Sequence, residues 1–302
     1  MTEDEIIILD NVNDDTYHAI ANEAVRYAIV SLPFTTNRMA IPDEQKRAIN
    51  IAKGKIAEAL FRMFCKNNNI PANFDACTTP FWTIDKRDFI LGGYEWDIKN
   101  NFLYTEKDLF SGNYTDLPAL IPNRYDGDQW SKRNEKVFEY CAGVRFLFTF
   151  LKAAHLKNTE RGQAFLEIIL NDDQLGFLKR LYRKYKGLPQ QQSPFSESWF
   201  WREMSQYGNS NLYKLHFKPA LIITGFACRD HCDNFKNTGP DDDKNHFQDH
   251  LKPLWYSKTS RGSCNFLNHH LMDNNHQCYA SCITSRLIYK HVPTFTKQNN
   301  RR

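Results

Sequence analysis

Two aspartates and a lysine lie close together in a stretch that has the pattern of a β-hairpin. Asp88 belongs to a first apolar run, and Asp97 and Lys99 alternate with apolar side chains on a second run. Gly92-Gly93 between the two runs favours a tight turn, because the central residues of such turns often need a positive φ. Side chains on a strand alternate between its two faces. The sequence therefore predicts that an acid on one strand faces an acid and a base on the next.

This combination of side chains is suited to the hydrolysis of a phosphodiester. Two carboxylates can hold Mg²⁺, which prefers oxygen ligands and usually keeps several waters. The metal polarises the phosphoryl oxygen and lowers the pKa of a bound water. The ammonium group of Lys99 can steer that water and offset the charge that develops on the phosphate. The structural alternative is a solvated strand face with alternating charges. The flanking aromatic residues and the acid on the partner strand favour the catalytic interpretation.

The spacing of these residues resembles a known motif. Asp88, eight intervening residues and then Asp97-Ile98-Lys99 are similar to the PD-(D/E)xK motif of the restriction-endonuclease-like nucleases. Arg87 stands where the name of the motif has proline. The resemblance covers roughly residues 44–151. It implies a metal-dependent nuclease with an α/β fold, a mixed sheet flanked by helices, in which Asp88 and Asp97 are metal ligands and Lys99 positions the water.

A helix predicted just before the hairpin carries a third candidate acid. It opens at a Pro-Asp-Glu sequence and runs over about residues 44–67, with apolar residues at helical spacing. Glu58 lies nearly opposite that apolar stripe and resembles the helix glutamate that often reaches the metal site in restriction-endonuclease-like folds. An ion pair with Lys55 or Arg62 is the alternative. Gly54 one turn earlier costs the helix about 1 kcal/mol relative to alanine, which favours a functional role here.

The remaining pattern predicts an organisation in three parts. Residues 1–40 form an N-terminal accessory helix, residues 41–230 form the nuclease core with inserted DNA-contacting segments, and residues 231–302 form an irregular C-terminal extension. Residues 5–9 are either a short strand or the start of a helix. Apolar periodicity predicts further helices over 14–32, 160–170, 172–186 and 196–207, and strands over 144–151 and 220–226.

The charge distribution is asymmetric and fits a nucleic-acid partner. Residues 1–150 carry 17 Lys and Arg against 22 Asp and Glu, whereas residues 151–302 carry 22 against 13. Cations in the second half, including the cluster over 179–186, could neutralise phosphates, although cations at the end of a helix also suit its dipole. The long polar segment 100–133 adds side chains able to contact phosphates and stack on bases. They are Arg124, Tyr125, Gln129, Trp130, Lys132 and Arg133.

Cysteine usage and hydropathy point to the cytoplasm. The chain begins with an acidic MTEDE sequence, and no apolar run approaches the roughly 20 residues that span a bilayer. Without a secretory signal, eight cysteines are expected to be thiols or metal ligands. Two Cys-x3-Cys pairs near the C-terminus could hold a structural zinc, although two intervening residues are the commoner spacing. The candidate cysteines are Cys228, Cys232, Cys264, Cys278 and Cys282, and the histidines among them are His231, His269, His270 and His276.

The resemblance implies, by analogy with enzymes of this size, a type II restriction endonuclease that cuts double-stranded DNA at a specific site with Mg²⁺. In this hypothesis Asp88, Asp97 and Glu58 bind the metal, and Lys99 completes the catalytic set. The chain contains no GxxxxGK[ST] motif. A homodimer would match a palindromic site. One alternative is a PD-(D/E)xK nuclease of repair, recombination or phage type, and another is a non-catalytic nucleic-acid-binding protein.

Overall fold

The computed structural model describes the greater part of the first 228 residues and four short strands beyond them. The described residues are 7–35, 43–83, 87–91, 94–103, 119–120, 145–153, 165–185, 194–208, 211–228, 235–237, 244–247, 255–257 and 263–264.

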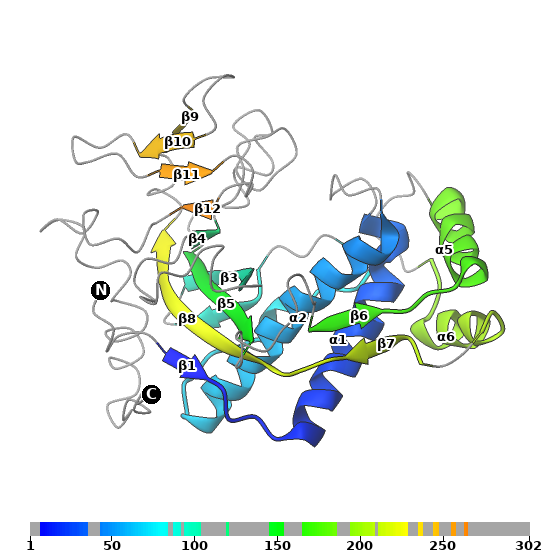
Figure 1. Cartoon of the computed structure of the whole chain (residues 1–302), viewed down its shortest axis with the longest axis horizontal. Coiled ribbons are helices and arrows are strands. Elements are labelled where there is room, and N and C mark those ends of the chain that lie inside the picture. The colour runs from blue at the N-terminus through cyan, green and yellow to red at the C-terminus, as the bar shows by residue number, and fades with distance from the viewer. Residues whose placement is uncertain are drawn as a thin grey trace, which may run out of the picture.

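A curved mixed sheet is the central element of the described chain (Figure 1). Its strand order is β1-β8-β5-β3-β2. The parallel pair β3 and β5 lies inside the sheet, and each of the other neighbouring pairs is antiparallel. This arrangement confirms the mixed α/β class that the sequence predicts. The strands are β1 (Ile7–Leu9), β2 (Phe89–Leu91), β3 (Tyr94–Leu103), β5 (Arg145–Ala153) and β8 (Pro219–Cys228).

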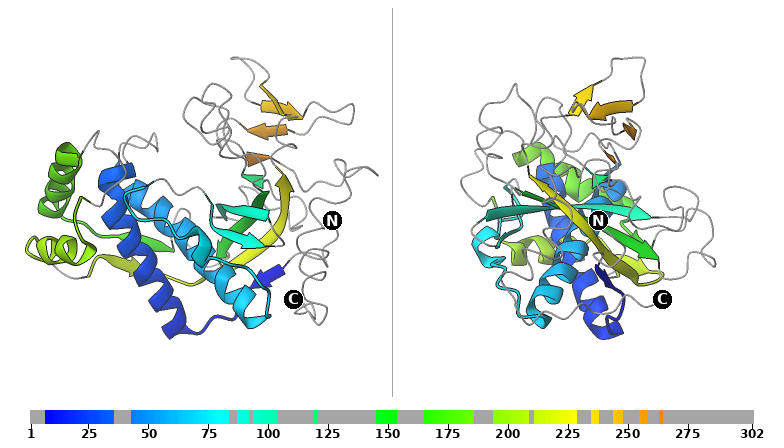
Figure 2. Two further views of the ribbon diagram at one scale, coloured as in Figure 1. Left: turned by 180° about the vertical axis from the view of Figure 1, so that it is seen from behind. Right: turned by 90° about the vertical axis from the view of Figure 1, so that its left-hand side faces the viewer.

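Helix α2 (Glu44–Asn67) packs across one face of this sheet (Figures 1 and 2). Asp43 caps it, because its carboxylate accepts a hydrogen bond of 3.0 Å from the backbone N–H of Lys46. The apolar stripe predicted from helical spacing is buried at Ala52 and Leu60. The start and end of this helix are therefore confirmed, and the helix fixes the position of the neighbouring strand β3.

Helix α1 (Asp14–Thr35) begins at the predicted residue but ends later than predicted. Asn13 caps it, since Asn13 Oδ1 accepts a 2.8 Å hydrogen bond from the N–H of Thr16. Its C-terminal end continues past Pro33, where the sequence predicts a stop. Leu32 and Pro33 are buried there, so packing maintains a turn in which proline has removed one backbone donor.

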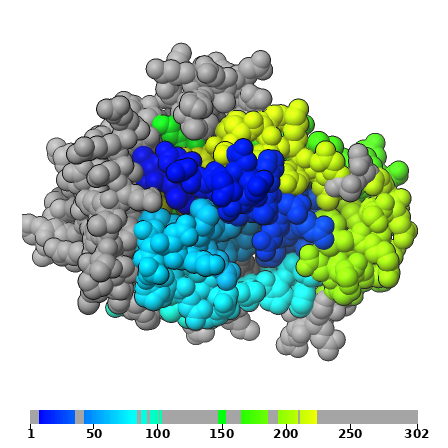
Figure 3. All heavy atoms as spheres, turned by 90° about the horizontal axis from the view of Figure 1, so that it is seen from below, coloured from blue at the N-terminus to red at the C-terminus, as the bar shows by residue number. Residues whose placement is uncertain are grey.

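Segment 1–40 is predicted as an accessory helix, but α1 belongs to the main hydrophobic core. Its side chains Tyr17, Val25 and Ile29 are fully buried and share one cluster with residues of α2 and the sheet. Viewed from below, α1 in blue borders both the cyan residues around the end of α2 and the yellow-green residues of α6 (Glu197–Ser205) (Figure 3). Contact with α6 includes Arg26, whose guanidinium carbon lies 4.1 Å from the ring centroid of Trp201.

The predicted helix over 160–170 is wrong where the structure describes this segment. Residues Leu166–Ile168 form strand β6, which pairs antiparallel with β7 (Tyr213–Leu215). Leu166 and Ile168 are buried while Glu167 is exposed, so the apolar period is that of a strand. The helix that follows, α5 (Asp172–Tyr185), is confirmed, as are α6 and the strands β5 and β8, within a few residues of the predicted bounds.

Short strands also occur in the C-terminal extension that is predicted to be irregular. Together with β4, which comes from the segment before β5, they form a sheet of order β4-β12-β11-β10-β9 within the described residues. Their bounds are β4 (Ala119–Leu120), β9 (Phe235–Asn237), β10 (Lys244–Phe247), β11 (Trp255–Ser257) and β12 (Ser263–Cys264). A search of the described helices for a segment long and apolar enough to cross a membrane finds none.

A buried lysine in α2 gives the fold a predicted dependence on pH. Lys53 is 6% exposed, and its ammonium group lies 4.7 Å from the ring centroid of Phe102. Burial, aided by repulsion from Lys46, lowers the pKa of Lys53 from 10.5 to about 8. The folded protein therefore loses this proton at lower pH than the unfolded chain, which binds more protons between those two values. Lys53 should make the free energy of unfolding rise by about 2 kcal/mol between pH 7 and pH 10.

The control for this prediction is Lys53→Met, which keeps an unbranched apolar stem and removes the titrating group. Urea denaturation of both proteins at pH 7 and pH 10 isolates the contribution of Lys53, because every other titrating group cancels in the difference. Wild type should be less stable than the variant at pH 7, and the gap should narrow at pH 10. If the difference in unfolding free energy between variant and wild type stays constant or widens from pH 7 to pH 10, Lys53 is not buried as a charge.

Candidate active site

The predicted hairpin is present, and its register places the two aspartates on neighbouring strands. Phe89 pairs with Trp96 and Leu91 pairs with Tyr94. Beyond these pairs, the N–H of Asp88 donates a 2.7 Å hydrogen bond to the carbonyl of Trp96. Asp88 therefore lies at the end of β2 beside Asp97 of β3. The predicted Gly-Gly turn lies outside the described residues.

Aromatic packing fixes the hairpin against α2. The indole of Trp96 is fully buried and stacks on Phe89, with ring centroids 5.8 Å apart and planes 4° apart. Its Nε1 donates a 3.0 Å hydrogen bond to the carbonyl of Leu91. Phe61 of α2 contacts Phe89 at a centroid distance of 5.1 Å. Deeply buried aromatic rings in such close contact hold the two strands rigidly, which is what a catalytic group on either strand requires.

The charged residues of β3 lie on the other face of the sheet. Trp96 and Phe102 share the face that packs on α2, as their contacts with Phe89 and Lys53 show. Asp97 and Lys99 are offset from them by an odd number of residues, so they project from the opposite face. The alternation predicted from the sequence is therefore confirmed.

Asp97 and Lys99 form an ion pair within that face. The Nζ of Lys99 lies 2.7 Å from Oδ2 of Asp97, and the two side chains are only 18% and 9% exposed. Phe148, beside Lys99 in the parallel register of β3 and β5, is fully buried. Charges in such a site interact more strongly than they would in water. The sequence spacing therefore identifies a pair of residues that meet in the folded chain.

The geometry of this pair leaves Asp97 suited to a further cation. Its Oδ2 is buried and lies 2.7 Å from the Lys99 ammonium, and among the described residues no donor reaches it at a favourable hydrogen-bond angle. The ion pair with Lys99 offsets part of the cost of burying this oxygen, and a second cation would offset more of it. Carboxylate oxygens are the ligands that Mg²⁺ prefers, so the residues present fit this ion.

Asp88 is held by the backbone of the partner strand. Its Oδ2 accepts a 2.6 Å hydrogen bond from the N–H of Ile98. The Asp88 carboxylate therefore stays next to Asp97. A metal ion bound by Asp88 would share this carboxylate with the Ile98 amide. Arg87, which stands at the proline position of the motif, forms an ion pair with Glu95 of β3. This pair gives the departure from the motif a structural role in the hairpin.

The hydrogen bond to Ile98 predicts different effects for two substitutions of Asp88. Asp88→Ala removes the acceptor and should lower the free energy of unfolding by about 1.5–3 kcal/mol, the usual loss for a hydrogen bond to a charged group. Asp88→Asn keeps an acceptor oxygen and should cost less than half of that. Urea denaturation of both variants measures the difference. Equal losses would mean that the carboxylate does not stabilise the hairpin through this bond.

Glu58 is not brought to the two aspartates. Its Oε2 pairs with Lys55 Nζ at 2.6 Å, and the same ammonium lies 5.0 Å from the ring centroid of Tyr27 in α1. Glu58 is therefore turned toward α1, whereas Asp97 projects from the sheet face opposite α2. A β-carbon placed on Gly54 would meet no atom within 4 Å, so this glycine does not mark a close approach. The ion pair with Lys55, the alternative that the sequence left open, is the arrangement observed.

Within the described part of the chain, no three His, Cys, Asp or Glu side chains are grouped to hold a metal ion. A magnesium site at the hairpin would accordingly rest on two carboxylates, with water completing the coordination. The predicted zinc cysteines fall on residues whose side chains lie outside the described set. The same holds for the candidate DNA-contacting side chains between Arg124 and Arg133.

Two polar features near the hairpin were missed by the sequence reasoning. Thr149 of β5 is fully buried and donates a 3.1 Å hydrogen bond to Oδ1 of Asn100 on β3, next to a register shift between β5 and β8. Lys53 of α2 is the other. Helical spacing could have identified Lys53, because it lies four residues after Ile49 and three before Ile56. No sequence pattern identifies the Thr149 bond, which joins residues 49 apart.

Comparisons of the chain with protein families, with characterised proteins and with solved structures find no match. The geometry of the hairpin therefore carries the functional argument.

Proposed function

We propose that this protein is a magnesium-dependent nuclease of the PD-(D/E)xK type that hydrolyses double-stranded DNA. The observation that carries the proposal is the buried Oδ2 of Asp97, which touches Lys99 and lies on the strand next to Asp88. The curved mixed sheet with a helix across one face is compatible with a restriction-endonuclease-like core.

In this proposal Asp88 and Asp97 would hold the metal, and Glu58 has no part. Bound Mg²⁺ supplies Lewis-acid polarisation of the phosphoryl oxygen and a water of lowered pKa. Asp97 would bind the metal from a buried position, and the Ile98 amide fixes the rotamer of Asp88. The Lys99 ammonium orients the attacking water and donates to the phosphate oxygens as negative charge develops on them. Its short distance to Asp97 keeps it aimed at the same point.

The proposed substrate is a DNA duplex, and the proposed biological role is that of a type II restriction endonuclease in the cytoplasm. The net charge of +4 and the cations of α5 support attraction to a polyanion. A homodimer is expected, because a two-fold protein matches a palindromic site. The test is digestion of intact plasmid with Mg²⁺. Defined fragments support restriction, whereas progressive loss from the ends of linear DNA would indicate a repair or recombination exonuclease.

A second candidate is a non-catalytic nucleic-acid-binding protein. One observation favours it: Lys99 pairs with Asp97 and Asp88 bonds to Ile98, so both acids have partners inside the hairpin. In that case the charges would stabilise the strand pair and perform no chemistry. Absence of cleavage of any plasmid or linear DNA with Mg²⁺ or Mn²⁺, together with retained DNA binding, would support this candidate.

The basic residues of α5 give a quantitative prediction for DNA binding. Lys179 and Arg183 line one cavity, whereas Arg180 and Lys184 lie over aromatic rings. Consecutive residues of a helix point about 100° apart, so the pair Lys179 and Arg183 faces a different direction from the pair Arg180 and Lys184. One straight duplex should therefore contact only one of the two pairs. Replacing all four with Gln should then reduce the slope of log affinity against log salt by about 1.8.

Two double variants show which pair contacts the duplex: Lys179→Gln/Arg183→Gln and Arg180→Gln/Lys184→Gln. One of them should reproduce the whole reduction of the slope, and the other should leave the slope unchanged. Binding is titrated with Ca²⁺ in place of Mg²⁺, so that cleavage does not remove the complex. A slope that neither double variant alters would place the DNA surface away from α5.

A further inference from the structure

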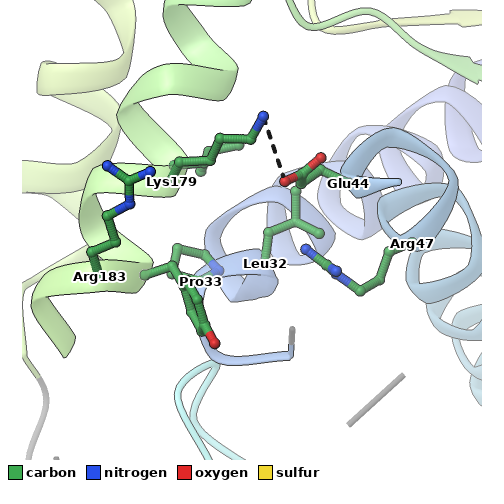
Figure 4. A pocket seen from close by; sticks show the side chains of 8 residues that line it. Leu32, Pro33, Glu44, Arg47, Lys179 and Arg183 are labelled. Atoms are coloured by element: carbon green, nitrogen blue, oxygen red, sulfur yellow. Dashed lines mark ion pairs between the residues drawn. The ribbon is translucent and has the colours of Figure 1, made fainter. Parts of the chain in front are cut away.

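A cavity of about 240 Å³ lies where α1, α2 and α5 meet (Figure 4). Part of its wall is apolar and consists of Leu32, Pro33 and Leu178. The other described lining residues are Tyr182 and four charged side chains. No step of the proposed nuclease reaction uses this cavity, because its lining residues come from the helices and not from the hairpin.

Among the described residues that line this cavity are three cations and one carboxylate, which together carry two net positive charges. Arg47 comes from α2, and Lys179 and Arg183 come from α5. The carboxylate of Glu44 lies 3.9 Å from Lys179 Nζ, at the outer limit for an ion pair, so it neutralises that cation only weakly. Figure 4 shows Lys179 and Arg183 on one side of the cavity and Arg47 on the other.

The depth of the charges differs across the cavity. Arg47 is 2% exposed, whereas the side chains of Glu44 and Lys179 are 25% and 55% exposed and form the mouth. Burial lowers the pKa of Arg47, whereas the nearby Glu44, Asp43 and Tyr182 act in the opposite direction. A guanidinium nevertheless stays charged in proteins, and keeping one buried is costly unless anionic groups approach it.

We propose that this cavity binds the phosphate group of a phosphomonoester, with the apolar wall contacting the organic part next to it. Arginine is suited to this role because its planar fork of donors matches phosphate oxygens. A phosphomonoester is close to a dianion at neutral pH, which balances the two net positive charges. The volume is below the roughly 300 Å³ at which pockets begin to enclose drug-sized ligands. It therefore suits a phosphate with a sugar-sized neighbour, and a base would remain outside.

The phosphate could belong to a free mononucleotide or to the 5′ end of a DNA strand. The proposal does not rest on the nuclease function, and its test measures binding without Mg²⁺. Isothermal titration calorimetry at fixed ionic strength compares inorganic phosphate, deoxyadenosine 5′-monophosphate, and one short single strand with either a 5′-phosphate or a 5′-hydroxyl. Tighter binding of the phosphorylated strand than of the mononucleotide would identify a DNA end, and the reverse order would identify a free nucleotide. Either order supports the proposal.

Two exposed cations of α5 supply a matched pair of variants. Arg183→Gln should weaken binding of the mononucleotide about tenfold, the loss expected for one charge-assisted hydrogen bond. Lys184→Gln makes the same change of charge one residue further along but does not line the cavity, and it should change affinity less than about twofold, as expected of an exposed charge without direct contact. Both side chains are exposed, so both variants are expected to fold.

Glu44→Gln provides a variant of opposite sign. Removing the only carboxylate among the described lining residues should tighten phosphate binding several-fold, which a purely structural role would not do. Three results would overturn the proposal: no saturable binding of any phosphomonoester at millimolar concentration, equal losses for Arg183→Gln and Lys184→Gln, or 5′-phosphate and 5′-hydroxyl strands that bind equally and both bind more tightly than the mononucleotide. The last result would show attraction to the internal phosphodiesters alone.

Discussion

Asp97→Asn should reduce DNA cleavage by roughly a thousandfold or more, because the metal supplies several kcal/mol of transition-state stabilisation. The change replaces the carboxylate whose Oδ2 is buried beside Lys99 with an amide of nearly the same shape. DNA binding should be largely retained, since the cations that attract the duplex are elsewhere. Plasmid nicking and gel-shift titration in Ca²⁺ on the same preparation measure the two quantities.

The control for Asp97→Asn is the folded state, because the substitution also removes the partner of a lysine that is 18% exposed. Breaking such a pair leaves a poorly solvated charge and should lower the free energy of unfolding. Circular dichroism and urea denaturation must therefore show a folded variant under the assay conditions. A folded variant that cleaves at nearly the rate of wild type would remove Asp97 from the proposed metal site.

Lys99→Met should reduce cleavage by about 10²–10³-fold, the usual cost of removing one group that stabilises developing charge. The affinity for Mg²⁺ should stay the same or rise. In the wild type the Lys99 ammonium lies 2.7 Å from Asp97 Oδ2 and competes with the metal, and the variant lacks this ammonium. Methionine keeps the apolar stem beside the buried Phe148. Calorimetric titration with Mg²⁺ and single-turnover cleavage at saturating Mg²⁺ separate the two effects.

Lys99→Arg serves as the companion variant, and it should also be slow. A planar guanidinium cannot occupy the position of a compact ammonium in a tight site. If Lys99→Met lost metal binding as completely as Asp97→Asn, the division of roles between ligand and charge-stabilising group would be wrong.

Elements defined by local patterns could be predicted from the sequence. Helix α2 begins at its aspartate cap and carries an apolar stripe, and the hairpin alternates apolar with charged residues around a Gly-Gly pair. The proximity of Asp97 and Lys99 follows from the period of a strand. The segment that became β6 was mispredicted, because three residues are too few for periodicity to separate a strand from a helix.

Arrangements that join distant parts of the chain could not be predicted. Spacing along α2 placed Glu58 off the apolar stripe, but it could not show whether that side chain faces the hairpin or α1. The hydrogen bond from Ile98 to Asp88 depends on the register of two strands. The charged cavity joins Arg47 to Arg183, residues far apart in the sequence. Such contacts follow from tertiary packing, which no local pattern encodes.

The central claim is that the Asp88, Asp97 and Lys99 hairpin hydrolyses phosphodiesters with Mg²⁺. Cleavage of closed circular plasmid by wild type and Asp97→Asn, each with Mg²⁺ and with a chelator, tests it most directly. We predict conversion to nicked and linear DNA by wild type with Mg²⁺ and no conversion in the other three reactions. Equal cleavage by the folded Asp97→Asn variant, or no cleavage by wild type that binds DNA, would contradict the claim.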